Sequence, residues 1–267
     1  MMGARARAKR SAWNLPKTQR ICIWCDGCAS ESRRREHIVA EGLGGARDYR
    51  LMGGLVCDSC NAGTLQKIDE EMLLIGPLRW LRAQFGLAPK GKHIAQGIEF
   101  DHEAKEFIVD TTKLRNNNAA HFDEMRGVIS MRVTGPSQQA RSEHLTRGLH
   151  RIAYNVLAHE RGGSFVRSRY RFLRDLVLDL DAIRERAFVF DQSGILPALQ
   201  QEAIGRTQRR WTSTASIMSG DDGEPELVRV DIGPAVFYTS VRRTTAPLAR
   251  IAAAMRDAIV YAVIDAP

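Results

Sequence analysis

Apolar residues recur at helical spacing in two segments of the chain. In the first they are Leu65, Ile68, Met72 and Ile75, and in the second Leu145, Leu149, Ile152, Val156 and Leu157. Residues three and four positions apart share one face of an α-helix, so the patterns predict amphipathic helices beginning near Cys60 and over 138–160. The other faces of the second helix carry Arg141, His144, Arg147, His150 and Arg151. We expect this polar surface to face solvent or phosphate groups.

Shorter segments have the composition and alternation of β-strands. Residues 97–100 and 106–110 flank a polar turn and predict a hairpin. Further strands are predicted at 35–40, 55–56, 128–133, 187–191, 227–232 and 235–241. Residues 165–180 predict a helix and 219–226 an exposed loop, whereas 247–264 fits either a helix or a strand. The expected fold class is α+β.

Composition divides the chain into three parts. Residues 1–20 carry six basic residues and no acid, which predicts a flexible basic arm. Residues 21–86 contain all five cysteines and predict a small module, in which Asp58 or Ser59 caps the helix that begins near Cys60. A glycine- and proline-containing linker at 86–92 precedes a larger mixed region at 93–267, expected to select a substrate or partner.

Net charge favours a polyanionic partner. The 267 residues carry a formal charge of +8, and the run Arg33, Arg34 and Arg35 is placed to hold phosphates of a nucleic acid. Hydrophobic residues make up 44% of the chain, yet its most apolar stretch, 248–264, is interrupted by charged residues. We therefore expect no membrane-spanning segment and a cytoplasmic, reducing location.

Four cysteines form two pairs, Cys22–Cys25 and Cys57–Cys60, each with the Cys-x-x-Cys spacing. Two such pairs about thirty residues apart are typical of a tetrahedral zinc site, and a site closed by four thiolates is structural. Cys28 is an alternative ligand or a spare thiol. A redox dithiol protein is a less suitable interpretation, because four clustered cysteines at this spacing favour zinc.

An acid–histidine pair, Glu36-His37, lies between the two cysteine pairs, and Asn61 follows the second pair directly. A carboxylate and an amide oxygen are hard ligands suited to Mg²⁺ or Mn²⁺. A neutral imidazole can accept a proton from water near neutral pH. Asp69, two helical turns after Asn61, is either a supporting residue or an ordinary surface acid.

The combined pattern resembles the HNH nuclease family over roughly residues 20–75. It consists of Cys22-x-x-Cys25, Glu36-His37-Ile38-Val39, Gly42-Leu43-Gly44-Gly45 and Leu55-Val56-Cys57-x-x-Cys60-Asn61. The resemblance implies a zinc-stabilised ββα-metal finger, followed here by the larger α+β region. Many relatives have an Asn before the second cysteine pair that steadies the histidine. This chain has Leu51-Met-Gly-Gly54 there, so another group must orient His37.

By this resemblance, the protein is predicted to be a metal-dependent endonuclease that hydrolyses phosphodiester bonds. His37 would activate water, while Glu36 and Asn61 would hold the divalent ion. DNA is the expected substrate and RNA the alternative. A single finger cuts one strand, so a homodimer or an activating partner is also expected, in a phage or defence setting by analogy. The alternative function is a non-catalytic zinc module that binds nucleic acid or protein.

Overall fold

The computed structural model describes five continuous stretches, 20–27, 35–73, 138–179, 187–191 and 211–255. It also describes shorter pieces at 75, 78, 81–82, 85, 87, 98–101, 106–109, 118–123, 128–133, 182, 193–195, 197–198, 201 and 258–262. The predicted arm, apart from Arg20, and the predicted linker, apart from Leu87, lie outside the described residues.

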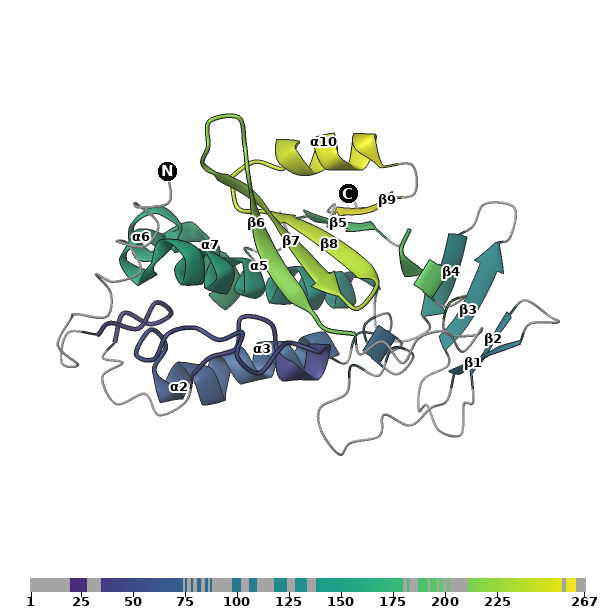
Figure 1. The fold of residues 1–267 in the computed structure, drawn as a ribbon, viewed down its shortest axis with the longest axis horizontal. Coiled ribbons are helices and arrows are strands. Elements are labelled where there is room, and N and C mark those ends of the chain that lie inside the picture. Colours follow the sequence, from purple (N-terminus) through teal and green to yellow (C-terminus); the bar gives the residue numbers. More distant parts are fainter. Residues whose placement is uncertain are drawn as a thin grey trace.

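A long helix, α5 (Gln138–Arg161), runs through the middle of the molecule (Figure 1). One of its sides packs on a five-stranded sheet, and another packs on α3 (Gln66–Leu73) of the cysteine-containing module. The predicted apolar stripe is buried, as expected. The expectation that the polar residues of this helix face solvent is wrong for its central residues, because His150 is fully buried and Arg151 is 1% exposed. The five-stranded sheet and α3 pack on different sides of α5 and exclude solvent from these side chains.

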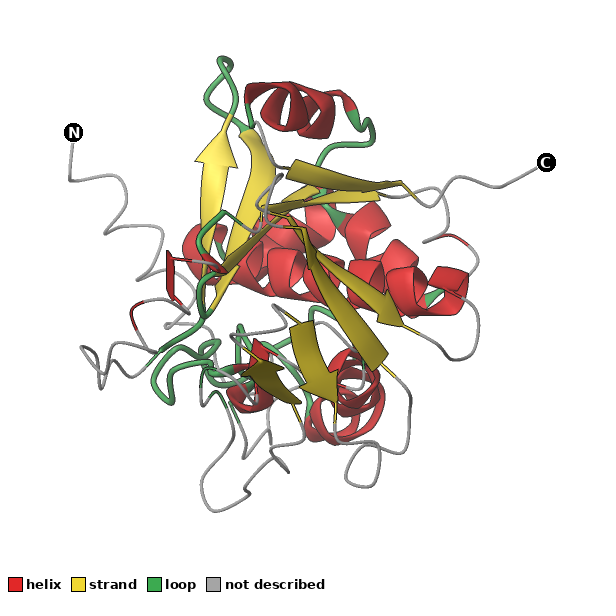
Figure 2. Ribbon diagram, turned by 90° about the vertical axis from the view of Figure 1, so that its right-hand side faces the viewer, coloured by secondary structure: helices red, strands yellow, loops and turns green. Residues whose placement is uncertain are grey.

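The five-stranded sheet has the order β6-β7-β8-β5-β9 and is antiparallel throughout. Its strands are β5 (Ala187–Asp191), β6 (Thr214–Ser219), β7 (Pro225–Ile232), β8 (Ala235–Ser240) and β9 (Ala258–Ala262). Helix α10 (Ala246–Ala254) covers the face opposite α5 (Figure 2). The undecided stretch 247–264 therefore contains both a helix and a strand. Strand β6 was not predicted, because four of its six residues (one Thr, one Ala and two Ser) have small side chains.

The helix predicted over 165–180 is divided in two, α6 (Gly163–Arg169) and α7 (Arg171–Leu178). Tyr170 breaks the helix with φ −120° and ψ 21°. Its ring is buried between Phe165 and Phe172, at centroid distances of 5.6 and 6.3 Å. Burial of this aromatic cluster offsets the interruption of the helix.

The cysteine-containing module has less regular structure than predicted. The expected strand at 35–40 is a single bridge, His37 with Arg50, flanked by two backbone hydrogen bonds, and 55–56 is a bend. The helical part comprises the short 3₁₀ turn η2 (Glu41–Leu43), α2 (Asp58–Cys60), a π-helical turn η3 (Asn61–Leu65) and α3. Cys57, rather than Asp58 or Ser59, is the N-cap, because its sulfur accepts the Cys60 N–H at 3.4 Å.

A separate four-stranded antiparallel sheet has the order β1-β2-β3-β4. Its strands are β1 (Ile98–Asp101), β2 (Glu106–Val109), β3 (Asn118–Asp123) and β4 (Val128–Val133). The predicted hairpin and the strand at 128–133 are confirmed, whereas β3 was not predicted.

The fold is mixed α+β, as predicted from the sequence. One apolar cluster joins the cysteine-containing module to α5 and the five-stranded sheet, with Trp24, Leu43, Ile68, Leu149 and Phe237 among its buried members. The division at 86–93 stays a prediction. Within the described part of the chain, no helix combines the length and apolar character needed to cross a membrane.

Candidate functional site

The four paired cysteines converge on one point. Each can offer a sulfur, and the four sulfurs lie within 4.8 Å of one another. A tetrahedral zinc site with Zn–S bonds of about 2.3 Å has sulfurs about 3.8 Å apart. The Cys25 and Cys57 sulfurs are 3.7 Å apart, which fits this geometry. The group therefore suits a structural zinc ion. Cys28 lies outside the described residues.

Backbone amides are arranged around the sulfurs. The N–H groups of Trp24 and Cys57 each donate to the Cys22 sulfur at 3.4 Å. Hydrogen bonding from the Cys60 thiol, together with backbone donors, lowers the pKa of the Cys22 thiol to about 5, against the effect of burial. The same contact raises the pKa of the Cys60 thiol, and burial raises that of Cys25, so Cys22 forms the thiolate first and a metal ion would displace the protons of the other thiols.

The segment that carries Glu36 and His37 is anchored to α5. Asn155, which is fully buried, donates through Nδ2 to the Glu36 carboxylate and to the His37 carbonyl, both at 3.4 Å. Its Oδ1 accepts the Trp24 indole N–H at 3.2 Å. Asn155 therefore links Trp24, which lies within the first cysteine pair, to the acid–histidine segment.

Arg151 forms a second anchor beside Asn155. Its Nη2 donates to Glu36 Oε1 and to Asp69 Oδ2, the latter at 3.0 Å, and its Nη1 donates to the Ile38 carbonyl at 3.1 Å. Desolvation raises the pKa of Glu36 despite the opposing charge of Arg151. Desolvation likewise raises the pKa of Asp69 to about 7, and its Oδ1 is buried without a hydrogen-bond partner among the described residues. Two acids and one arginine thus share a poorly solvated space.

His37 is more accessible than Glu36, with 22% of its side chain exposed. Its Nε2 lies 2.8 Å from Arg50 Nε and 3.1 Å from Glu41 Oε1, and Arg50 Nη2 also contacts Glu41 at 3.1 Å. Burial, and then the charge of Arg50, lower the pKa of His37 against the attraction of Glu41. The imidazole is consequently neutral at neutral pH.

The glycines after this segment are required by a tight turn. Gly44 ends η2 with a positive φ of 85°. A Cβ atom on Gly45 would collide with the Val39 carbonyl. The Gly45 N–H donates to the Ala40 carbonyl at 3.1 Å and closes the turn.

The remaining predicted residues are placed as follows. Asn61 begins the π-helical turn directly after Cys60 and is partly exposed. Arg35 is exposed beside Glu36, while Arg33 and Arg34 lie outside the described residues. Among the described residues, the four cysteines are the group of metal-ligating side chains that lie close enough to share an ion, and Glu36 is not part of that group.

Sequence reasoning missed four residues of the site: Glu41, Arg50, Arg151 and Asn155. A signal for two of them exists in the spacing of polar residues along α5, where 143, 147, 151 and 155 are four apart and interrupt apolar sequence. Positions four apart lie on one helix face. Arg147 and Arg151 on this face meet Glu71 and Asp69 of the facing helix.

Comparisons with protein-family models, with curated proteins and with solved structures found no match to this chain.

Proposed function

We propose that the protein is a metal-dependent endonuclease of the HNH type, in which His37 activates water for attack on a phosphodiester bond. The observation that carries this proposal is the placement of Glu36-His37 between the two halves of a four-cysteine group, with Asn61 directly after the last sulfur ligand. A neutral, partly exposed histidine beside a zinc-stabilised scaffold supports the role of general base.

Glu41 supplies the orienting group that the missing Asn would have provided. If the Nε2 proton of His37 is donated to Glu41 Oε1, at 3.1 Å, the lone pair on Nδ1 is free to accept a proton from water. If instead Arg50 donates to Nε2, the basic lone pair is occupied and Nδ1 carries the proton. Catalysis requires the first tautomer, so Glu41 is a positioning residue and Arg50 its competitor for Nε2.

The proposal also includes a catalytic Mg²⁺ or Mn²⁺ held by Glu36 and Asn61. Such an ion would neutralise charge on the phosphate. In the present arrangement the Glu36 carboxylate does not fit this role, because it is 4% exposed and Arg151 and Asn155 already bind it. Binding a divalent ion would require the carboxylate to exchange its arginine partner for the ion. The metal requirement is therefore tested separately from the base.

A non-catalytic zinc module that binds nucleic acid or protein is the second candidate function. Two contacts favour it: Arg50 bound to His37 Nε2 and Arg151 bound to the Glu36 carboxylate. Both contacts occupy the groups that catalysis would use. This function needs the cysteines and the fold but not the imidazole.

Incubation of supercoiled plasmid with the purified protein separates the two functions. The nuclease proposal predicts nicking that requires Mg²⁺ or Mn²⁺ and is abolished in His37→Ala, with zinc content and circular dichroism unchanged. Lys67→Ala, at an exposed position on α3, is the control and should keep most of the activity. Absence of nicking by the wild type on DNA and on RNA would leave the binding module as the function.

A further inference from the structure

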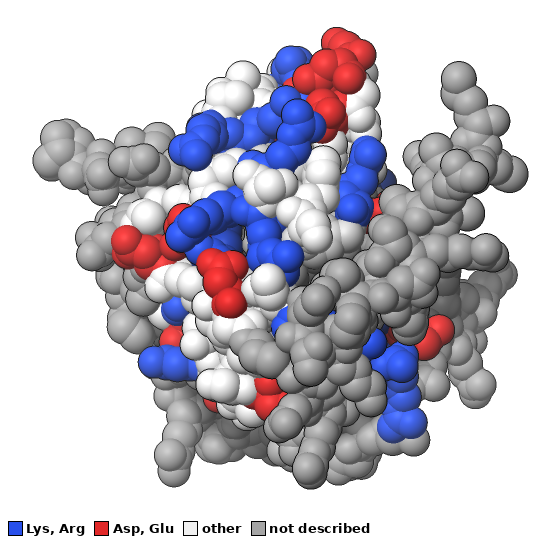
Figure 3. Space-filling view, turned by 90° about the vertical axis from the view of Figure 1, so that its left-hand side faces the viewer, with Lys and Arg blue, Asp and Glu red and all other residues white. Residues whose placement is uncertain are grey.

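A set of exposed or partly exposed arginines gathers where α6, α7 and the loop from β8 to α10 meet, which we call the arginine face. Its members are Arg161, Arg167, Arg169, Arg171, Arg242 and Arg243. Arg161, Arg169 and Arg242 all act electrostatically on Tyr170, and Arg167 and Arg171 act on Asp26. Figure 3 views the side of the molecule on which α6 and α7 lie and shows basic side chains gathered there, interspersed with acids.

Aromatic rings support two of these arginines. The Arg243 guanidinium lies 4.6 Å from the centre of the Phe172 ring, and that of Arg169 lies 5.8 Å from the Phe165 ring. A guanidinium over an aromatic face is held in place while its N–H groups stay available. These side chains therefore lose less conformational entropy on binding an anion than free arginines would.

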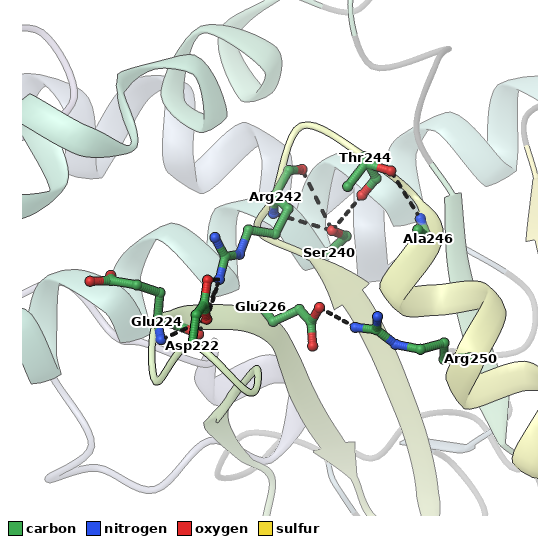
Figure 4. A network of polar contacts seen from close by, with 8 residues as sticks. All are labelled: Asp222, Glu224, Glu226, Ser240, Arg242, Thr244, Ala246 and Arg250. Carbon is green, nitrogen blue, oxygen red and sulfur yellow. Dashed lines mark hydrogen bonds and ion pairs between the residues drawn. The ribbon is translucent and has the colours of Figure 1, made fainter.

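The loop that carries Arg243 is itself fixed by side-chain hydrogen bonds (Figure 4). Ser240 Oγ donates to the Thr244 carbonyl at 2.8 Å and accepts the Arg242 N–H at 3.2 Å. The Arg242 guanidinium binds both oxygens of Asp222 at 2.7 and 2.8 Å. Arg243 thus projects from a defined turn beside α7.

Acids pair with three of the six arginines, including the two-oxygen contact of Asp222 with Arg242, and so reduce the charge of the face without cancelling it. Arg169 pairs with Glu224, but both side chains are about half exposed, at 59% and 43%. Arg171 and Asp175 are 3.9 Å apart and are more exposed still, at 67% and 58%. Exposed pairs of this kind contribute roughly 0–1 kcal/mol, so a phosphate can replace the carboxylate at little cost.

The arginine face adjoins the first cysteine pair. Arg167 Nη1 donates to the Ile21 carbonyl at 2.9 Å, one residue before Cys22. Arg174, which is nearly buried, pairs with Asp26 just after Cys25. A chain of phosphates lying on α6 and α7 would consequently reach the cysteine-containing module.

We infer that the arginine face binds the phosphate backbone of nucleic acid. The density of guanidinium groups, their support by aromatic rings and their position beside the first cysteine pair all favour this partner. Contacts to phosphates alone predict affinity that depends steeply on salt and little on sequence. The inference deepens the proposed function. It rests on that function for one point, that the bound nucleic acid is the substrate.

Fluorescence anisotropy with zinc-loaded protein and no added divalent ion tests the inference independently of catalysis. The probes are labelled DNA and RNA duplexes of about 20 base pairs, titrated at about 50 to 200 mM salt. The variant is Arg169→Gln/Arg171→Gln/Arg243→Gln. The matched control, Lys67→Gln/Arg229→Gln/Arg250→Gln, removes the same charge from α3, β7 and α10.

We expect the face variant to bind at least one duplex about tenfold or more weakly than the control. The slope of log affinity against log salt should fall by up to about 0.9 for each phosphate that the variant no longer neutralises. The duplex that wild type binds more tightly identifies the partner.

Equal binding by both triple variants on both probes, or no wild-type binding to either, would overturn the inference. If wild type binds and the face variant binds more weakly, but no plasmid nicking is seen, the face stands and the nuclease proposal fails. If nicking is seen while the triple variants bind equally, the nuclease proposal stands and the face fails.

Discussion

The four-cysteine group and the acid–histidine group differ in how their geometry is set. Each cysteine pair is a local turn that presents two sulfurs, and a backbone hydrogen bond from Ile23 to Leu55 joins the two turns, so that the four sulfurs lie within 4.8 Å of one another. Glu36 and His37 depend on partners from elsewhere, namely Arg151 and Asn155 on a helix more than a hundred residues away, and Arg50 and Glu41 across a turn. Spacing along the chain thus indicates which residues are the metal ligands, whereas the anchoring of Glu36 by Arg151 and Asn155 depends on the tertiary fold.

Removal of one of the four cysteine sulfurs should cause the largest loss of stability. Structural zinc contributes about 10–16 kcal/mol to folding in small zinc domains, which matches or exceeds the whole stability of an ordinary domain. We expect Cys57→Ser to lose its zinc and the cooperative unfolding transition, as measured by elemental analysis and thermal denaturation. Ser59→Ala, between the two cysteines, is the control. A folded, zinc-free Cys57→Ser protein would show that the cysteines are not the scaffold.

Loss of Arg151, the cation between Glu36 and Asp69, should cause the second largest loss of stability. Arg151→Met leaves Glu36 and Asp69 in a poorly solvated space without their shared cation. Breaking a buried ion pair in this way destabilises by about 3–5 kcal/mol, which urea denaturation can measure. Arg169→Met removes an exposed partner instead and should cost about 1 kcal/mol or less.

Two further substitutions check the cause of the Arg151 effect. Adding Glu36→Gln and Asp69→Asn to Arg151→Met removes the unpaired charges and should restore much of the stability. A stability no higher than that of Arg151→Met alone would mean that Arg151 acts through packing rather than through charge.

The sequence predicted the local features well and the long-range ones poorly. The cysteine pairs and the apolar stripe of α5 follow from spacing, which neighbouring residues decide. The polar residues of α5 were expected to face solvent or phosphate because their four-residue spacing marks a shared helix face but not the sheet and the second helix that pack on α5. Arg151 and Asn155 are buried for that reason, and their partners Glu36 and Asp69 are far away in the sequence.

The dependence of stability on pH should reveal the raised pKa of Asp69. Its carboxyl has a pKa of about 7 in the folded protein and about 3.9 when unfolded. The folded protein keeps a proton that the unfolded chain releases, so this group makes the free energy of unfolding fall as pH rises from about 4 to 7. Asp69→Asn should remove up to about 1.4 kcal/mol per pH unit of that slope. Urea denaturation at several pH values measures it, and an unchanged slope would contradict the assignment.

The smallest effects should be changes in the pKa of His37, with opposite signs for substitutions of its two neighbours, Glu41 and Arg50. Glu41 raises and Arg50 lowers the pKa of this imidazole. Glu41→Gln should therefore lower the pKa further and Arg50→Gln should raise it, each by up to about one unit. NMR titration of the imidazole measures both. Shifts of the same sign would show that at least one of the two neighbours does not act through its charge.

The central claim is that the cysteine group holds the scaffold while His37 performs the chemistry. Its most direct test is the rate of plasmid nicking by His37→Ala relative to wild type, at equal zinc content and in the presence of Mg²⁺ or Mn²⁺. Positioned general bases contribute typically about 10²–10⁴-fold to a rate, so we expect a loss in that range with zinc and fold intact. A His37→Ala protein that nicks at the wild-type rate would contradict the claim.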